Sequence, residues 1–180
     1  MRAYAALLGA VLALAPVVVG AEQGGTDMAF AISSPDFAAG QPIPRDFTCS
    51  GKDVSPGLSW GNPPSGTQFF ALICDDPDAP GGTWVHWVIY NIPGTAKGLP
   101  RSVKAVKDLP DGSQQGKNDF GKIGYGGPCP PAGKPHRYFF TLYALSRKLP
   151  LASGATKKEV LASMQGAVVA KAELVGSYGR

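Results

Sequence analysis

The sequence FFALICDDPDAP at residues 69–80 decides the fold. Its first six residues form a continuous apolar run, which is typical of a strand buried on both faces. The next six hold three aspartates and two prolines, so the strand ends in a stiff acidic turn. Thr83 to Ile92 is rich in Trp, Val, Ile and Tyr and predicts a second strand. A chain that leaves this turn and returns beside it brings the two strands together.

Similar short apolar runs recur along the chain between turn signals. They predict further strands at Met28–Ser33 and Arg137–Leu145. The 180 residues include 24 glycines, 17 prolines and only three glutamates, which argues against helical bundles and coiled coils. A hydrophobic share of 44% argues against disorder. No series of helices separates the strands, so we expect a mostly β protein, a β-sandwich with one main helix near the C-terminus.

The expected helix begins at Thr156. Thr156 and Glu159 have the spacing of a capping box, with Thr156 as the N-cap. An apolar stripe at helical spacing follows and predicts contacts with the core. Its members are Val160, Leu161, Met164 and Val168. Beyond Ala170 the pattern alternates again, which predicts a final strand around residues 171–176.

The first residues have the pattern of a cleaved export signal. Met1-Arg2 is a short basic start, Ala5–Val19 is largely apolar, and small residues precede Glu22. We therefore expect a signal peptide at residues 1–21, a flexible segment at 22–27 and one domain at 28–180. The mature protein is predicted to be periplasmic or secreted, with no stable membrane insertion after cleavage. A net charge of +4 without a run of basic residues gives no support to nucleic-acid binding.

Export makes disulfide bonds possible, and the chain has three cysteines. Cys74 lies in the apolar run and is predicted to be buried and free. Cys49 and Cys129 both lie in turn-rich loops, so we hypothesise that they pair. Three free thiols are the alternative.

Candidate site residues gather around the acidic turn. His86 interrupts an apolar strand and needs a polar partner, which Asp76 or Asp78 can provide. His136 opens a later strand, after a glycine-rich loop whose backbone N–H groups can face an anion. A carboxylate that orients an imidazole and supports its protonated form would create an anion pocket. A solvated turn and structural histidines are the alternative interpretation.

In combination and order, the motifs resemble the phosphatidylethanolamine-binding protein family, also called Raf kinase inhibitor-like proteins, in its exported bacterial branch. The resemblance implies a sandwich of two antiparallel sheets with a shallow pocket for phosphate-like groups. It covers nearly all of residues 28–179 and rests on DVSPGLSW (53–60), DPDAP (76–80), HWV (86–88), NIP (91–93), NDFG (118–121), GGP (126–128), PHRY (135–138) and AELVG (172–176). The pocket residues it implies are Asp76, Asp78, Pro80, His86, Gly127, Pro128, His136 and Tyr138.

The expected function is that of a non-enzymatic binding protein for phosphate or a phosphorylated headgroup, with regulation or inhibition of another protein as its role. No catalytic residue, cofactor or metal is assigned. One alternative is a hydrolase that uses Asp76, His86 and His136 as an acid–base or zinc site. Another is an interaction module that resembles a protease inhibitor. The sequence does not define the oligomeric state.

Overall fold

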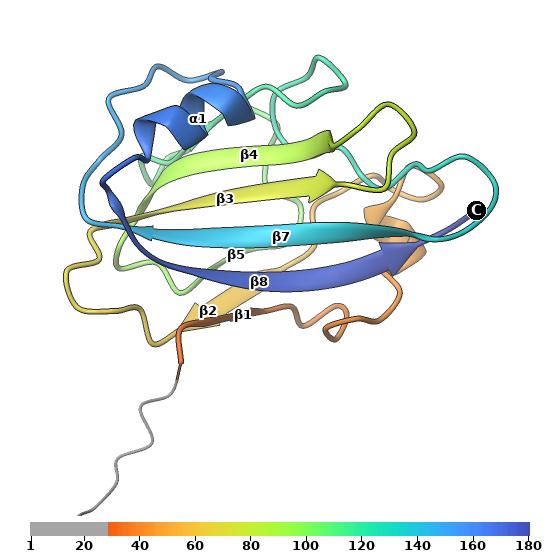
Figure 1. Ribbon diagram of the computed structural model, residues 1–180, viewed down its shortest axis with the longest axis horizontal. Coiled ribbons are helices and arrows are strands. Elements are labelled where there is room, and N and C mark those ends of the chain that lie inside the picture. Colours follow the sequence, from red (N-terminus) through yellow and green to blue (C-terminus); the bar gives the residue numbers. More distant parts are fainter. Residues whose placement is uncertain (1–28) are drawn as a thin grey trace, which may run out of the picture.

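The computed structural model describes residues 29–180, so the predicted signal peptide, the segment at 22–27 and Met28 lie outside the described residues. Eight strands form two antiparallel sheets, as expected (Figure 1). The larger sheet has the order β6-β4-β3-β7-β8 and the smaller one β1-β2-β5. The elements are β1 (Ala31–Ser33), a 3-10 turn (Arg45–Phe47), β2 (Leu58–Gly61), β3 (Phe69–Asp76), β4 (Trp84–Pro93), β5 (Gly98–Leu99), β6 (Gln114–Gln115), β7 (His136–Leu145), α1 (Lys157–Ser163) and β8 (Val168–Tyr178).

The main core lies between the two sheets. The small sheet contributes Ile32, Leu58 and Trp60, and the Trp60 and Phe70 rings lie 5.4 Å apart. Strands of the large sheet meet them with side chains that are at most 2% exposed. These are Phe70, Leu72, Cys74, Trp87, Ile89, Tyr138, Phe140, Leu142 and Leu174.

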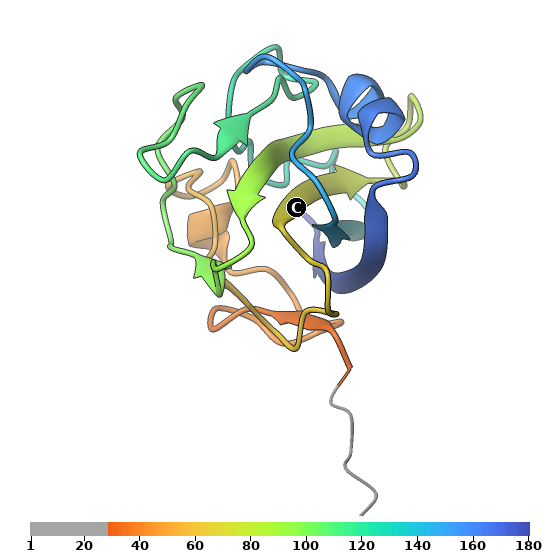
Figure 2. The same ribbon diagram turned by 90° about the vertical axis from the view of Figure 1, so that its left-hand side faces the viewer.

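Helix α1 covers the opposite face of the large sheet. Val160 and Met164 pack there against Ile73, Val88 and Tyr90. Figure 2, which looks roughly along the strands, shows the helix on the far side of the sheet from β1. Strand β3, which was predicted to be buried on both faces, is therefore covered by the second sheet on one face and by α1 with its flanking loops on the other.

The capping box forms as predicted, but the apolar stripe is shorter than predicted. The Thr156 N–H donates to Glu159 Oε2 at 2.7 Å, and the Glu159 N–H donates back to Thr156 Oγ1 at 3.4 Å. The predicted core contacts of Leu161 and Val168 are wrong, since their side chains are 36% and 46% exposed. The helix ends at Ser163, so Val168 is already the first residue of β8. Within residues 29–180, no helix is long and apolar enough to cross a bilayer.

Strand β8 is longer than the predicted segment. It pairs with β7 from Val168 opposite Leu145 to Tyr178 opposite His136. Strand β7 in turn pairs with β3, so the ends of β3 and β8 meet at the start of β7. This end of the large sheet, on the right in Figure 1, holds the candidate site.

The two sides of α1 predict unequal effects of truncation. Met164→Ala is expected to lower the free energy of unfolding by about 2–5 kcal/mol, because it leaves a cavity against the large sheet. Leu161→Ala is expected to cost less than about 1 kcal/mol, because that side chain is partly in water. Urea unfolding followed by circular dichroism measures both. Equal losses in the two variants would contradict the helix orientation.

Candidate functional site

A cavity of about 230 Å³ opens at the end of the sandwich where β3 ends and β4 and β7 begin. Four predicted site residues line it: Asp76, Pro80, His86 and His136. The rest of the lining comes from the acidic turn, the start of β4 and two loops. These residues are Ala79, Trp84, Phe120, Cys129, Pro130 and Pro131.

Asp76 and His136 meet because β3 and β7 are antiparallel neighbours. The register pairs Asp75 with Phe139, which makes Asp76 and His136 diagonal neighbours on one face. His136 Nδ1 donates to Asp76 Oδ2 at 2.8 Å. Asp76 Oδ1 accepts the backbone N–H of Asp78, also at 2.8 Å. The buried carboxylate is thus held through both oxygens and fixes the His136 ring.

A β-bulge in β4 turns His86 into the cavity. The register pairs Cys74 with Trp87 but Asp75 with Val85, so His86 is the extra residue of the bulge. In a regular strand, neighbours such as His86 and Trp87 would face opposite sides of the sheet. The bulge lets Trp87 fill the core between the sheets while His86 lines the cavity.

The Gly126 carbonyl fixes the tautomer of His86. The contact from His86 Nδ1 to Gly126 O is 2.6 Å, and since a carbonyl oxygen only accepts, Nδ1 carries the proton. Phe120 and Tyr138 each pack edge-to-face with the His86 ring, with ring centroids 5.4 and 5.1 Å apart. Burial lowers the pKa of His86 below its ordinary 6.5, against the opposing effects of the Gly126 carbonyl and the Asp76 charge. The free protein therefore holds His86 neutral at pH 7.

The Nε2 atoms of His86 and His136 are the free nitrogens of the cavity. Neither has a hydrogen-bond partner among the described residues. In that part of the chain, only the hydroxyls of Ser113 and Tyr138 are buried side-chain polar groups without a partner. The two Nε2 atoms are not among these fully buried groups. Both are therefore accessible through the cavity that their rings line.

The glycine-rich loop serves close packing here rather than anion contacts. Residues 116–126 run along the edge of β4, where the Gly126 N–H donates to the His86 carbonyl at 2.9 Å. A Cβ at Gly126 would lie 2.6 Å from the Phe120 ring, so a larger residue would displace that wall of the cavity. The Gly127 N–H is also occupied, since it donates to Asp53 Oδ1 at 2.6 Å.

The structure places Asp78 outside the cavity lining. Its carboxylate forms a two-pronged ion pair with Arg137, with distances of 2.9 Å to Nε and 2.7 Å to Nη2. These hydrogen bonds lower the pKa of Asp78 to about 2. Side chains alternate along β7, so Arg137 points away from the cavity while His136 lines it.

Three more predicted residues stand behind the lining. Gly127 and Pro128 are buried, and the Pro128 carbonyl accepts the N–H of Cys49 at 3.1 Å. Tyr138 packs on the His86 ring, and burial raises the pKa of its phenol. These residues shape the site without facing it.

Two aromatic residues at the opening of the cavity, Trp84 and Phe120, were not among the predicted site residues. Trp84 and Phe120 form an edge-to-face pair at 5.4 Å and remain 39% and 40% exposed. Trp84 lines the cavity at the start of β4. Phe120 belongs to the NDFG motif at 118–121 but was not predicted as a pocket residue. Its neighbour Asp119 fixes the loop, because its carboxylate accepts the Val85 N–H at 2.7 Å.

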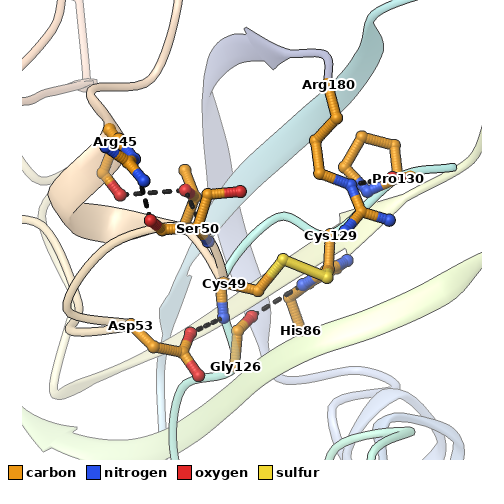
Figure 3. Close-up of a disulfide and its surroundings, with 11 residues drawn as sticks. Arg45, Cys49, Ser50, Asp53, His86, Gly126, Cys129, Pro130 and Arg180 are labelled. Carbon is orange, nitrogen blue, oxygen red and sulfur yellow. Dashed lines mark hydrogen bonds between the residues drawn. A yellow bond between two sulfur atoms is a disulfide. The ribbon is translucent and has the colours of Figure 1, made fainter. Parts of the chain in front are cut away.

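The hypothesised disulfide is present. Cys49 and Cys129 are bonded, with their Cα atoms 5.4 Å apart (Figure 3). Cys74 is free and buried in the core, as expected. Because Cys129 lines the cavity, the disulfide is part of its wall.

The zinc set considered from the sequence is not assembled. Within residues 29–180, no three His, Cys, Asp or Glu side chains gather closely enough to hold a metal ion. Asp76 is already bound to His136, and His86 is bound to Gly126.

Comparison with known proteins identifies relatives of this chain. Residues 33–179 match the family model described as phosphatidylethanolamine-binding protein. A protein of Methanothermobacter thermautotrophicus named UPF0098 protein is 54% identical over 138 residues, which cover 77% of this chain and 91% of that protein. A protein of the same name from Aquifex aeolicus is 48% identical and covers 83% of this chain and 88% of its own length.

Solved structures agree with the sequence match. Escherichia coli YbcL, described as a member of the mammalian PEBP family, superimposes with a TM-score of 0.78 at 38% identity. A Chlamydia trachomatis homologue of phosphatidylethanolamine-binding protein gives a TM-score of 0.77 at 37% identity. Each alignment covers 84% of this chain and 98% of the solved chain. The chain therefore belongs to the phosphatidylethanolamine-binding protein family.

Proposed function

We propose that this chain is an exported, non-enzymatic binding protein whose cavity takes a small anion, phosphate or a phosphorylated headgroup, and through it regulates or inhibits another protein. Membership in the family indicates a binding protein. The single observation that supports an anionic ligand is a pair of imidazoles in one cavity. They belong to His86 and His136, and their free Nε2 atoms face that cavity. Protonated imidazole nitrogens make strong hydrogen bonds to phosphate-like oxygens.

The two rings are held differently. His136 is hydrogen-bonded to the Asp76 carboxylate, which supplies a counter-charge next to any positive charge on that ring. His86 rests on the neutral Gly126 carbonyl in a buried position. With its proton on Nδ1, neutral His86 presents Nε2 to the cavity as an acceptor.

An anion changes the protonation of His86. A bound negative charge stabilises the imidazolium form, in which Nε2 becomes a donor to the anion. Binding therefore takes up a proton, either from water or from a ligand that carries one, such as monohydrogen phosphate. Phe120, Tyr138 and the Gly126 carbonyl contact the ring, Asp75 and Asp76 act on it as negative charges, and His136 lines the same cavity.

His136 and Arg137 offer a matched test, because they are adjacent residues of which only His136 lines the cavity. His136→Gln is expected to weaken phosphate binding about 10–100-fold, the effect of losing a charged hydrogen bond worth about 1.5–3 kcal/mol. Arg137→Gln is expected to change the Kd less than about twofold, since the exposed Arg137–Asp78 pair lies outside the site. Isothermal titration calorimetry with inorganic phosphate measures both.

Equal weakening in the two variants would show general electrostatic attraction and contradict a specific site. Turnover of an aryl phosphate ester by the native protein, lost in His136→Gln, would instead support the hydrolase alternative. Absence of phosphate binding to the native protein would overturn the proposal.

The uptake of a proton by His86 predicts a pH dependence. Sulfate is the probe, because it remains a dianion between pH 5 and 8. Sulfate affinity is expected to rise as the pH falls from 8 and to level off below the pKa of His86, which lies under 6.5. The rise should be smaller in His86→Gln. Affinity that is independent of pH, or that increases with pH, would contradict the role given to His86.

A further inference from the structure

A loop outside the large sheet supports one wall of the cavity. Residues 47–53, named here the clamp loop, begin at the last residue of the 3-10 turn and carry Cys49. Residues 125–131, named here the wall segment, carry Cys129 (Figure 3). The disulfide joins these two segments across a sequence separation of 80.

Three hydrogen bonds accompany the disulfide. The Gly127 N–H donates to Asp53 Oδ1 at 2.6 Å, and the Cys49 N–H donates to the Pro128 carbonyl at 3.1 Å. The Tyr125 hydroxyl donates to the Phe47 carbonyl at 2.8 Å. The clamp loop thus holds the wall segment at residues 125, 127, 128 and 129. Elsewhere the segment is held by β4, through the Gly126 N–H and the His86 carbonyl, and by Arg180, whose Nε donates to the Pro130 carbonyl at 2.6 Å.

The wall segment contributes to the site in two ways. Cys129, Pro130 and Pro131 line the cavity directly. Gly126 provides the carbonyl that orients His86 and holds the proton on its Nδ1. A displacement of this segment therefore moves one wall and releases one of the two imidazoles.

We propose that the Cys49–Cys129 disulfide is a positioning pair for the anion cavity, so that its reduction reversibly weakens anion binding. The inference rests on the proposed function. It also uses the exposure of the bond, because Cys49 and Cys129 are both solvent-exposed and open to a reductant. Once the bond is cut, the clamp loop holds the wall segment by hydrogen bonds alone.

The reductant is a dithiol. One of its thiolates attacks a sulfur of the pair, which gives a mixed disulfide and releases the other cysteine as a thiol. The second thiol then displaces the remaining cysteine. Two electrons and two protons pass to the protein, which ends with thiols at Cys49 and Cys129, while the dithiol ends as a disulfide.

Cys74 does not interfere with this exchange. It is fully buried in the core, and burial raises the pKa of its thiol, so the reactive thiolate is scarce there. Oxidation of the reduced protein therefore restores the original pair.

The test compares phosphate binding by the native chain in three states: oxidised, reduced with a dithiol, and reoxidised. Mass spectrometry after alkylation checks that Cys49 and Cys129 are modified and Cys74 is not. The temperature is chosen so that the circular dichroism of the reduced and oxidised forms agrees. Met164→Ala, kept oxidised, is the control for lost stability, because Met164 lies on the opposite face of the large sheet.

We expect the Kd for phosphate to rise about tenfold or more on reduction, to recover on reoxidation, and to stay unchanged in Met164→Ala. Equal Kd values for the oxidised and reduced forms would overturn the positioning role and leave the proposed function intact. No binding by the oxidised form would overturn both.

A second readout needs no ligand. Solvent exchange of the His86 Nδ1 proton, followed by NMR, should be faster in the reduced protein, because the Gly126 carbonyl is less firmly placed. An unchanged rate would overturn the positioning role whatever the phosphate result.

Discussion

The hydrogen bond between His86 Nδ1 and the Gly126 carbonyl, 2.6 Å long, joins the large sheet to the segment that walls the cavity. On the sheet side, its position depends on the β-bulge that turns His86 inward. On the loop side, it depends on contacts such as that between Gly127 and Asp53, next to the disulfide. Because the bond occupies Nδ1, it also leaves Nε2 as the nitrogen available to the cavity. Shape and protonation of the site thus depend on one contact.

The site combines two imidazoles with different partners. His136 shares a hydrogen bond with the buried Asp76 carboxylate, whereas His86 has a neutral partner in a position where burial lowers its pKa. In the proposed function, an arriving anion therefore meets one ring that already has a counter-charge beside it and one that becomes charged as the anion binds. The Asp78 carboxylate lies outside the cavity lining, where it is paired with Arg137. His136 lines the cavity and Arg137 does not, because adjacent side chains of a strand point to opposite faces of the sheet.

Local patterns predicted much of this molecule. The apolar runs that became β3, β4 and β7 were long enough to identify, and the capping box at Thr156 placed the start of α1. Three of the residues that line the cavity could be predicted from these strands: Asp76 ends β3, His86 lies near the start of β4 and His136 begins β7. The fourth, Pro80, lies in the turn and was implied only by the family resemblance. The bulge at His86 could not be predicted, since it depends on how β3 and β4 pair rather than on β4 alone.

The other differences between the predicted and the observed site lie in loops. Gly127 and Pro128 were predicted to face the ligand, but they are bonded to Asp53 and Cys49, and the next residues, Cys129 to Pro131, line the cavity. The central claim is that the two free imidazole nitrogens hold one anion, and ¹⁵N NMR of the histidine side chains during a phosphate titration tests it most directly. The Nε2 resonances of His86 and His136 should shift together with a single Kd. Nε2 resonances that do not move at saturating phosphate would contradict the claim.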